Sequence, residues 1–402
     1  MSIVSVNPYL TKRGSSDTMN HTGVRHHPRV RVFKPIFLLS LLTAMAIAGS
    51  IPRPALASPS PKPPSFTVTA IGLPGASYTE ALAISGNGQV SGISGVSGGS
   101  GDAFLYTKTG MYDLGRPKGS DASYADGVNN KGVVAVTSYF PGDKAVPSAV
   151  KVVGGNGVWT RLTGAHGAKV GGDANGIDDA GLVVGEIFPK ANTDTRSEWS
   201  GSHYTYSSPR NPLGNGDSWL QAVDGYGDAT GNVDHMARGK NLTSGYVWQS
   251  TGSTTRLSPV ASGDQRTWGM AVARSAGATK TLVAVGEADY SAAMWIVPVA
   301  KGPGSTRPAV VKLLGHLKGF TDESNALGVN RSGWVVGESS DPSYNEAAFL
   351  WRSGHMYNLN ALIPSKSGWT LSTATAINNA GQIVGDGLYK GVPTGFLLNP
   401  AP

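Results

Sequence analysis

Residues 374–385, ATAINNAGQIVG, decide the fold of this chain because versions of the stretch recur along the polypeptide. Each version has a β-branched residue, a polar turn that ends in glycine, and a valine-rich run that ends in a second glycine. Asn and Asp accept hydrogen bonds from their own backbone, and glycine supplies a positive φ where the chain re-enters a strand. The stretch therefore predicts a tight hairpin between two short β-strands.

Seven copies follow one another, and the fourth and fifth depart from the pattern. The β-branched residues that open them are Ile84, Val128, Ile177, Val223, Val272, Val329 and Ile377. These residues are 44, 49, 46, 49, 57 and 48 positions apart. We expect positive φ at the turn glycines Gly88, Gly132, Gly181, Gly227, Gly333 and Gly381. The second glycine is expected to permit close approach of the neighbouring sheet.

Each copy is followed by two more strand-like segments. AFLW at 348–351 and MYNL at 356–359 form one such pair, and AFLY at 103–106 and MYDLG at 111–115 form another. A unit of four short strands that repeats every 40–50 residues or so is typical of a propeller blade. The sequence thus predicts an all-β, seven-bladed β-propeller with four-stranded blades over residues 66–400.

The two ends of the repeat region complement each other. The seventh unit stops at GFLL, 395–398, and lacks a fourth strand, while FTVTAIGLP, 66–74, resembles a fourth strand without a unit. We therefore predict that the N-terminal strand closes the ring and leaves no open edge. The alternative is an open β-repeat solenoid, which would need capping repeats instead.

The first 57 residues have the pattern of a signal peptide with a long basic n-region. An apolar run at Ile36–Ile51 is followed by Ala55-Leu56-Ala57, and cleavage is expected before Ser58. A run of about 16 residues is short for a membrane span of about 20, which favours cleavage over an uncleaved anchor. Residues 58–65 form a Pro/Ser-rich spacer. The prediction is Sec-type export to the periplasm or the extracellular space, with no stable membrane anchor afterwards.

Most of the net positive charge of the chain lies in these first 57 residues, the leader. The whole chain has a net charge of +7, yet residues 1–57 hold seven basic residues against one acidic residue. The remaining 26 basic and 25 acidic residues nearly cancel. Such a domain lacks the basic field that binds phosphate backbones, so no nucleic-acid partner is expected. The chain has no cysteine, which excludes disulfides, thiolate metal sites and cysteine nucleophiles.

The repeated A-x-x-I-N-N-x-G-x-V-V-G, followed by A-F-L-W and M-x-x-L-G, resembles the HAF family of probable extracellular repeat proteins. Residues 374–385, and 326–337 with 348–359, show the resemblance most plainly, and it covers roughly 66–398. It implies export and a repeat fold. The family has no settled biochemical activity, so it supplies no site residues.

Ligands of propellers usually meet the face formed by the loops that lead into the first strand of each blade. Aromatic residues could stack on sugar rings there, and carboxylates could accept hydrogen bonds from hydroxyls. The candidate ligand-binding residues are Tyr78, Tyr124, Trp219, Trp268, Trp369, Asp126, Asp173 and Asp322; further acids on this face are Glu80, Asp217 and Asp264. The alternative is that these aromatics pack between blades and the acids form turns.

No catalytic, metal or cofactor motif is present. The histidines after the leader, His166, His203, His235, His316 and His355, show neither H-x-H nor H-E-x-x-H spacing. We therefore expect no cofactor, no metal and a monomeric binding or scaffold module for an extracellular glycan or protein. The alternative is a secreted propeller hydrolase or lyase, with carboxylates and His166 or His316 converging at the channel mouth.

Overall fold

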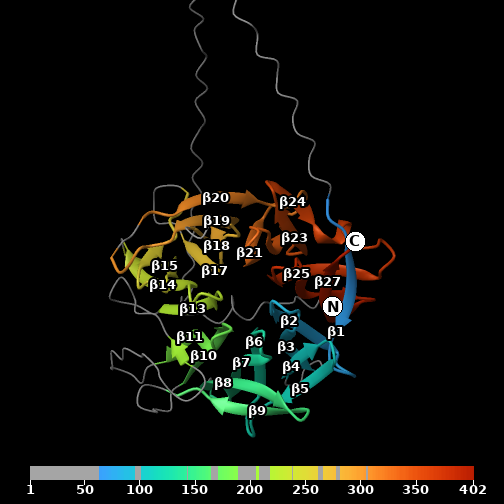
Figure 1. Ribbon diagram of the computed structural model, residues 1–402. Helices are drawn as coiled ribbons and strands as arrows, with labels where there is room; N and C mark the ends of the chain where they lie inside the picture. The colour runs from blue at the N-terminus through green and yellow to red at the C-terminus, as the bar shows by residue number, and fades with distance from the viewer. Residues whose placement is uncertain are drawn as a thin grey trace, which may run out of the picture. The chain divides into compact units, whose positions relative to one another are not determined.

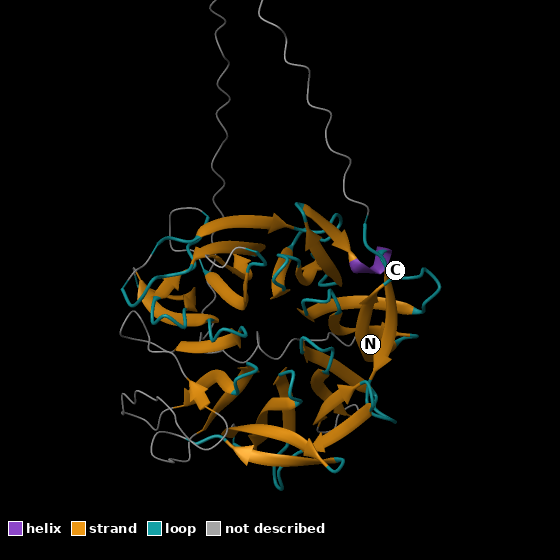
Figure 2. Cartoon of the chain, in the orientation of Figure 1, coloured by secondary structure: helices purple, strands orange, loops and turns teal. Residues whose placement is uncertain are grey.

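The computed structural model describes residues 63–95, 101–142, 144–163, 171–188, 205–207, 218–237, 239–260, 266–277, 281–304 and 307–402. These residues form short β-strands gathered into small sheets that are arranged in a ring, as in a β-propeller (Figures 1 and 2). The expected all-β fold is confirmed. Within the described residues, no helix combines the length and apolar character needed to cross a bilayer.

Six sheets are four-stranded and antiparallel, and five of them use strands in sequence order. They are β2 (Tyr78–Ile84), β3 (Val90–Gly95), β4 (Gly101–Thr107) and β5 (Gly110–Gly115); β6 (Ala122–Val128), β7 (Val133–Phe140), β8 (Lys144–Val153) and β9 (Asn156–Arg161); β13 (Ser218–Val223), β14 (Ala229–Ala237), β15 (Lys240–Trp248) and β16 (Thr254–Arg256); β17 (Thr267–Arg274), β18 (Thr281–Ala288), β19 (Ser291–Pro298) and β20 (Val310–Gly315); β21 (Glu323–Val329), β22 (Val335–Ser340), β23 (Glu346–Arg352) and β24 (His355–Asn358).

The sixth four-stranded sheet joins the two ends of the repeat region. It contains β25 (Trp369–Ile377), β26 (Ile383–Tyr389) and β27 (Val392–Pro400), with β1 (Phe66–Ile71) on the outside of β27. β1 runs antiparallel to β27, with Val68 opposite Leu398. Figure 1 shows the blue N-terminal strand beside the red C-terminal one. A short 3-10 helix, η2 (Leu359–Ala361), precedes this sheet.

The described residues of the third repeat do not form a four-stranded antiparallel sheet. Its described strands are β10 (Gly171–Ile177), β11 (Leu182–Phe188) and β12 (Thr205–Ser207), and β12 runs parallel to β11. No apolar run comparable to AFLW follows β11 in the sequence before β13. The prediction of seven four-stranded blades is therefore wrong: the described residues form six.

The first and last sheets are in direct contact, which excludes the open solenoid. Along the ring, the first strand of each repeat contacts the first strand of the next, and β25 also contacts β2. Thr375 donates from Oγ1 to the carbonyl of Ala81 at 2.6 Å, and Asn378 donates from Nδ2 to the carbonyl of Ser85 at 3.0 Å. A solenoid would leave these two sheets at opposite ends.

Neighbouring sheets are held by apolar packing and by hydroxyl groups that bridge them. One core cluster combines Leu350 of the sixth repeat with Phe396 of the seventh, both fully buried. Ser324, near the start of β21, accepts at Oγ from the amide of Ala292 at 2.8 Å and donates to the carbonyl of Gly315 at 2.9 Å. Both of these partners belong to the preceding sheet. Ser123 and Thr267 make the same pair of bonds to the sheets that precede them.

The second glycine of the motif is in close contact with a strand of its own sheet. A Cβ at Gly337 would overlap the carbonyl of Asn325, which lies on the first strand of the same repeat. The cause is a β-bulge: the register between β21 and β22 shifts between Ala326 and Gly328, and the first hairpin of every repeat has the same shift. A bulge bends the strand and redirects its carbonyls. The prediction that this glycine permits close approach of the neighbouring sheet is therefore wrong, because the group that approaches it belongs to its own sheet.

The turn glycines have the predicted conformation. Their φ angles are 85°, 71°, 98°, 77°, 73° and 77° at Gly88, Gly132, Gly181, Gly227, Gly333 and Gly381. At Gly381 a Cβ would also lie 3.2 Å from the Trp334 ring and 3.4 Å from Pro400. A β-branched residue there meets both a strained backbone and a closed space.

We expect Gly381→Val to lower the free energy of unfolding by roughly 1 kcal/mol or more, because valine is strained at positive φ. Denaturant unfolding followed by circular dichroism measures the loss. Gly302→Val is the matched control, since a Cβ at Gly302 meets nothing within 4 Å. Equal stability of the two variants would contradict the assigned role of the turn.

Candidate functional site

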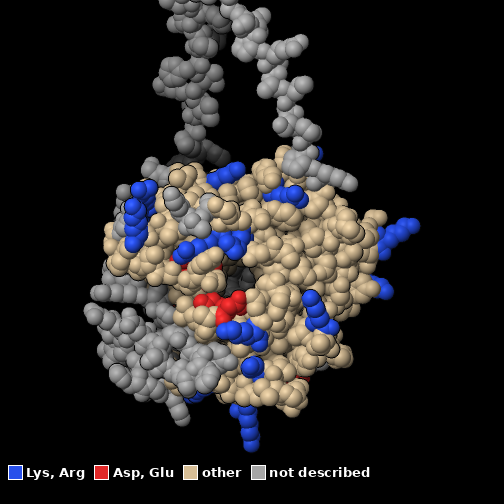
Figure 3. Space-filling model, viewed as in Figure 1, with Lys and Arg blue, Asp and Glu red and all other residues tan. Residues whose placement is uncertain are grey.

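The hairpin turns between the first and second strands meet at the centre of the ring and line a cavity of about 540 Å³. Every repeat contributes to its wall, through residues 84–86, 128–130, 177–179, 223–226, 272–274, 329–331 and 377–379. The space-filling view shows a hollow at the centre of the ring with acidic and basic side chains beside it (Figure 3). The repeated motif therefore supplies the wall of the cavity as well as the hairpins.

Most of the asparagines in these turns make hydrogen bonds that stabilise the fold. Asn330 accepts at Oδ1 from the amides of Ser332 and Trp334, at 3.0 and 3.1 Å, and so holds its own turn. Its Nδ2 donates to the carbonyl of Asn378 in the next repeat at 3.1 Å. One side chain thus shapes a turn and ties two repeats together.

The same link recurs around the ring wherever an amide occupies this position. Asn129 donates from Nδ2 to the carbonyl of Asp178 at 3.0 Å, and Asn378 donates to Ser85. Asp178 and Asp224 take the equivalent position in the third and fourth repeats. A carboxylate retains the turn-forming acceptor but has no amide to donate onward.

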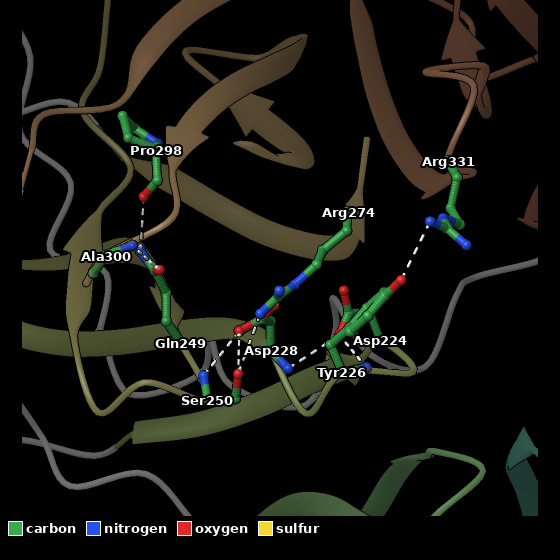
Figure 4. A network of polar contacts seen from close by, with 9 residues as sticks. All are labelled: Asp224, Tyr226, Asp228, Gln249, Ser250, Arg274, Pro298, Ala300 and Arg331. Atoms are coloured by element: carbon green, nitrogen blue, oxygen red, sulfur yellow. Dashed lines mark hydrogen bonds and ion pairs between the residues drawn. The ribbon is translucent and has the colours of Figure 1, made fainter. Parts of the chain in front are cut away.

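The charged residues of the cavity lie on the third to sixth repeats, and Figure 4 shows those of the fourth, fifth and sixth. Arg274 donates from Nε to Oδ2 of Asp228 at 2.6 Å. Asp228 is fully buried and also accepts from the backbone amide and hydroxyl of Ser250, at 2.8 and 3.0 Å. Because the Asp228 carboxylate is satisfied on both oxygens, it fixes the Arg274 side chain at the cavity wall.

Two guanidinium groups lie close to the Tyr226 ring. The Arg274 Cζ lies 4.4 Å and the Arg331 Cζ lies 5.6 Å from the centroid of the ring, within the range of cation–π attraction. Arg331 also donates from Nη2 to the Tyr226 hydroxyl at 3.3 Å. In the described part of the chain Arg331 has no carboxylate partner. Tyr226 remains 48% exposed, so its ring is available to a ligand.

Asp224 brings a carboxyl group with an unusual proton affinity into the same wall. Its Oδ1 accepts from the amides of Tyr226 and Asp228, at 2.8 and 3.1 Å. Its Oδ2 is buried and has no hydrogen-bond partner among the described residues. Burial, with the negative charge of Asp228 in addition, raises the pKa of Asp224 to about 6. This carboxyl can therefore donate or accept a hydrogen bond near neutral pH.

The wall has two chemically different sides. Asp178, Asp179 and Asp224 lie on the third and fourth repeats, while Arg274 and Arg331 lie on the fifth and sixth. Such a wall can bond hydroxyls, amides and anionic oxygens in fixed directions. No group of three metal-ligating side chains exists among the described residues.

None of the eight residues predicted from the sequence lines this cavity, which is formed by the turns. Four of the five aromatic candidates lie against other aromatic rings. Trp219 and Trp268 come together at 6.0 Å between centroids, and Tyr124 meets Tyr139 edge to face at 5.6 Å. Trp369 stacks on Tyr389 at 5.0 Å.

Several of the other candidates lie near Tyr124 and its neighbour Tyr139. Burial, with Glu80, Tyr78 and Asp126 nearby, raises the pKa of Tyr124 to about 12, and Asp126 lies near Tyr139 as well. Asp173 accepts from the Tyr139 hydroxyl at 3.2 Å, and Asp126 lies at the bulge of β6. Asp322 is exposed before β21, and its amide donates to the carbonyl of Ser340 at 3.0 Å. Tyr78 begins β2, where burial and the nearby Glu80 raise its pKa. Asp217 and Asp264 lie outside the described residues.

A set of buried or half-buried acids was not predicted from the sequence. Glu186, Glu287, Glu338 and Asp386 each follow the second glycine of the motif directly. Glu338 accepts from Oγ1 of Thr373 at 2.8 Å and from Nδ2 of Asn325 at 3.4 Å. Burial raises the pKa of Glu338 and raises that of Asp386 well above its usual range. The recurrence of an acid directly after Val-Gly was the signal that could have revealed them.

Histidines add no second site in the described residues. His166 and His203 lie outside them. His316 has Nε2 3.2 Å from the carbonyl of Tyr290 and does not line the cavity. The geometry therefore gives no support for His316 as an acid or base at the channel.

Comparison of the sequence with protein-family models and with curated proteins finds no match. The site must be interpreted from its own geometry.

The buried acids make stability depend on pH. Burial, with Glu338 nearby, raises the pKa of Glu346 to about 7, so the folded state favours the neutral acid. The resulting stabilisation is fully present below the pKa of the unfolded chain and is lost as pH rises toward 7. We expect the Tm to be higher at pH 5 than at pH 8, and Glu346→Gln to reduce this difference. Calorimetry measures it, with the exposed Asp121→Asn as control; a pH dependence unchanged in Glu346→Gln would contradict the assignment.

Proposed function

We propose that this protein is a secreted or periplasmic, non-enzymatic binding module that takes a polar glycan into its central cavity. The observation that carries the proposal is the cavity wall, where an exposed Tyr226 ring lies beside Arg331, Arg274 and Asp224. Its volume of about 540 Å³ lies within the usual range of small-ligand sites.

The chemistry of the wall favours a saccharide over an apolar ligand. Sugar hydroxyls both donate and accept, so a wall with carboxylates on one side and guanidinium groups on the other can satisfy both roles. The Tyr226 ring offers an apolar face for the C–H side of a pyranose. A protein loop inserted into the cavity is the alternative ligand.

The cavity residues provide the test. Tyr226→Ala and Arg331→Gln should each weaken binding of the best ligand from a glycan array about tenfold, which corresponds to about 1.4 kcal/mol. Matched controls are Tyr344→Ala and Arg307→Gln, because both residues are exposed and lie outside the cavity. Isothermal titration of the purified domain measures the affinities. Unchanged affinity in both cavity variants would overturn the proposal.

Export and family membership belong to the same proposal. The basic segment, the apolar run Ile36–Ile51 and the Ala55-Leu56-Ala57 site support a signal peptide cleaved before Ser58, and these residues lie outside the described part. The repeated motif supports membership of the HAF family. N-terminal sequencing of exported protein checks the cleavage, and an N-terminus that retains the apolar run would contradict it.

We further propose that β1 closes the ring. Support comes from its antiparallel register with β27 and from the contact of β27 with β2 of the first repeat. Phe66 is 2% exposed and packs in the core cluster of the last two repeats. Without β1, this apolar surface and the edge of β27 would face water.

Closure predicts that Val68→Cys with Leu398→Cys forms a disulfide in the native state, because these residues are opposite each other. Val68→Cys with Leu388→Cys is the mismatched control, since Leu388 pairs with Thr370 and Pro393 instead. Electrophoresis without reductant separates the two outcomes. Equal cross-linking of both pairs, or of neither, would contradict closure by β1.

A further inference from the structure

A second hollow lies away from the axis, between the first and second repeats, with a volume of about 410 Å³. Three lysines from three separate segments line it. Lys108 lies in the turn between β4 and β5, Lys131 in the turn between β6 and β7, and Lys151 on β8. We call this hollow the lysine groove.

The lysine groove holds positive charge without a counter-charge. No aspartate or glutamate lines it. All three lysines are exposed, and none pairs with a carboxylate in the part of the chain that the structure describes. Outside the leader, the chain has nearly equal numbers of acids and bases, so this local excess stands apart from the rest of the domain. Such a patch attracts an anion.

The floor of the groove is built to hold more than an ion. Tyr112 and Val152 line it and pack on the core cluster shared by the first and second repeats. The Tyr112 hydroxyl lies 3.2 Å from Oγ1 of Thr109, which lies 2.9 Å from Oγ1 of Thr107. An aromatic ring with hydroxyls beside it suits a sugar ring, which has an apolar face and a polar edge.

Hydrogen bonds between the repeats hold the two walls of the groove together. Asn87 and Gln89 of the first repeat also line the groove, and both donate to the carbonyl of Asn130 in the second, at 2.9 and 3.3 Å. The backbone amide of Asn87 donates to Oδ1 of the Asn130 side chain at 2.8 Å. Because the walls are joined directly, the width of the groove is fixed before a ligand arrives, which lowers the entropic cost of binding.

We propose that the lysine groove is a binding site for an acidic oligosaccharide. The anionic groups of the sugar contact Lys108, Lys131 and Lys151, and one pyranose ring lies against Tyr112. The site is separate from the central cavity, with which it shares no lining residue.

The test is isothermal titration of the purified mature domain with trigalacturonate. Maltotriose is the neutral sugar of equal length, and inorganic phosphate tests for a simple anion site. Lys108→Gln/Lys131→Gln/Lys151→Gln removes the charges of the groove. Lys301→Gln/Lys318→Gln/Lys366→Gln is the matched control, because it removes the same net charge from exposed lysines outside the groove.

We expect trigalacturonate to bind the wild type with an affinity that falls as salt rises, and the groove variant to bind at least tenfold more weakly. The control variant should bind trigalacturonate as the wild type does, and both triple variants leave every residue of the central cavity in place. Circular dichroism and Tm confirm that both triple variants are folded. Equal weakening in the two triple variants, equal binding of maltotriose, binding of phosphate alone, or no binding at all would each overturn the proposal.

Discussion

At three of the hairpin turns, successive repeats depend on one side chain that is used twice: the asparagine that opens the turn. Its carbonyl oxygen holds the turn, and its amide reaches the carbonyl of the next repeat, as Asn330 reaches Asn378 and Asn378 reaches Ser85. A buried donor or acceptor left unsatisfied costs free energy, so a turn and its neighbour must be formed together. The bridging hydroxyls of Ser123, Thr267 and Ser324 extend the same rule to the outer strands.

The candidate site lies where this rule is relaxed. The position of Asn379 in the last repeat is held by arginine in the fifth and sixth repeats, as Arg274 and Arg331, and the position of Ala380 is held by Tyr226 in the fourth. Residues that break a repeat pattern without serving the fold are candidates for function. The glycan site that we propose is therefore an asymmetric feature placed on a nearly symmetric wall.

The spacing of the repeats and the residues of their turns were enough to predict three features: the hairpins, the positive φ of the turn glycines and the contact of the first repeat with the last. The sequence did not predict that the described residues of the third repeat form three strands, because the count of four strands was extended across a segment with no apolar run. The bulge opposite Gly337 redirects the carbonyl of Asn325, and no particular residue type marks this bulge in the sequence. The close contact of the glycine was therefore assigned to the neighbouring sheet instead of its own. The predicted ligand-binding residues were taken from the strand-entry loops. Tyr226 and Arg331, which line the central cavity, belong to turns that had been explained by backbone conformation alone.

The pairing of β1 with β27 has a consequence for how the chain reaches its fold. Thr67 and Asn399, which share a hydrogen bond in this pair, are separated by 332 residues. Contacts between residues so distant in sequence form slowly, because the entropy of closing the loop is lost before the contact stabilises anything. β1 is synthesised early and cannot pair until β27, the last strand, has been made. Until the two strands pair, their edges are open to pairing with other chains. The rate-limiting and most aggregation-prone step of folding is therefore expected to be the meeting of the two ends.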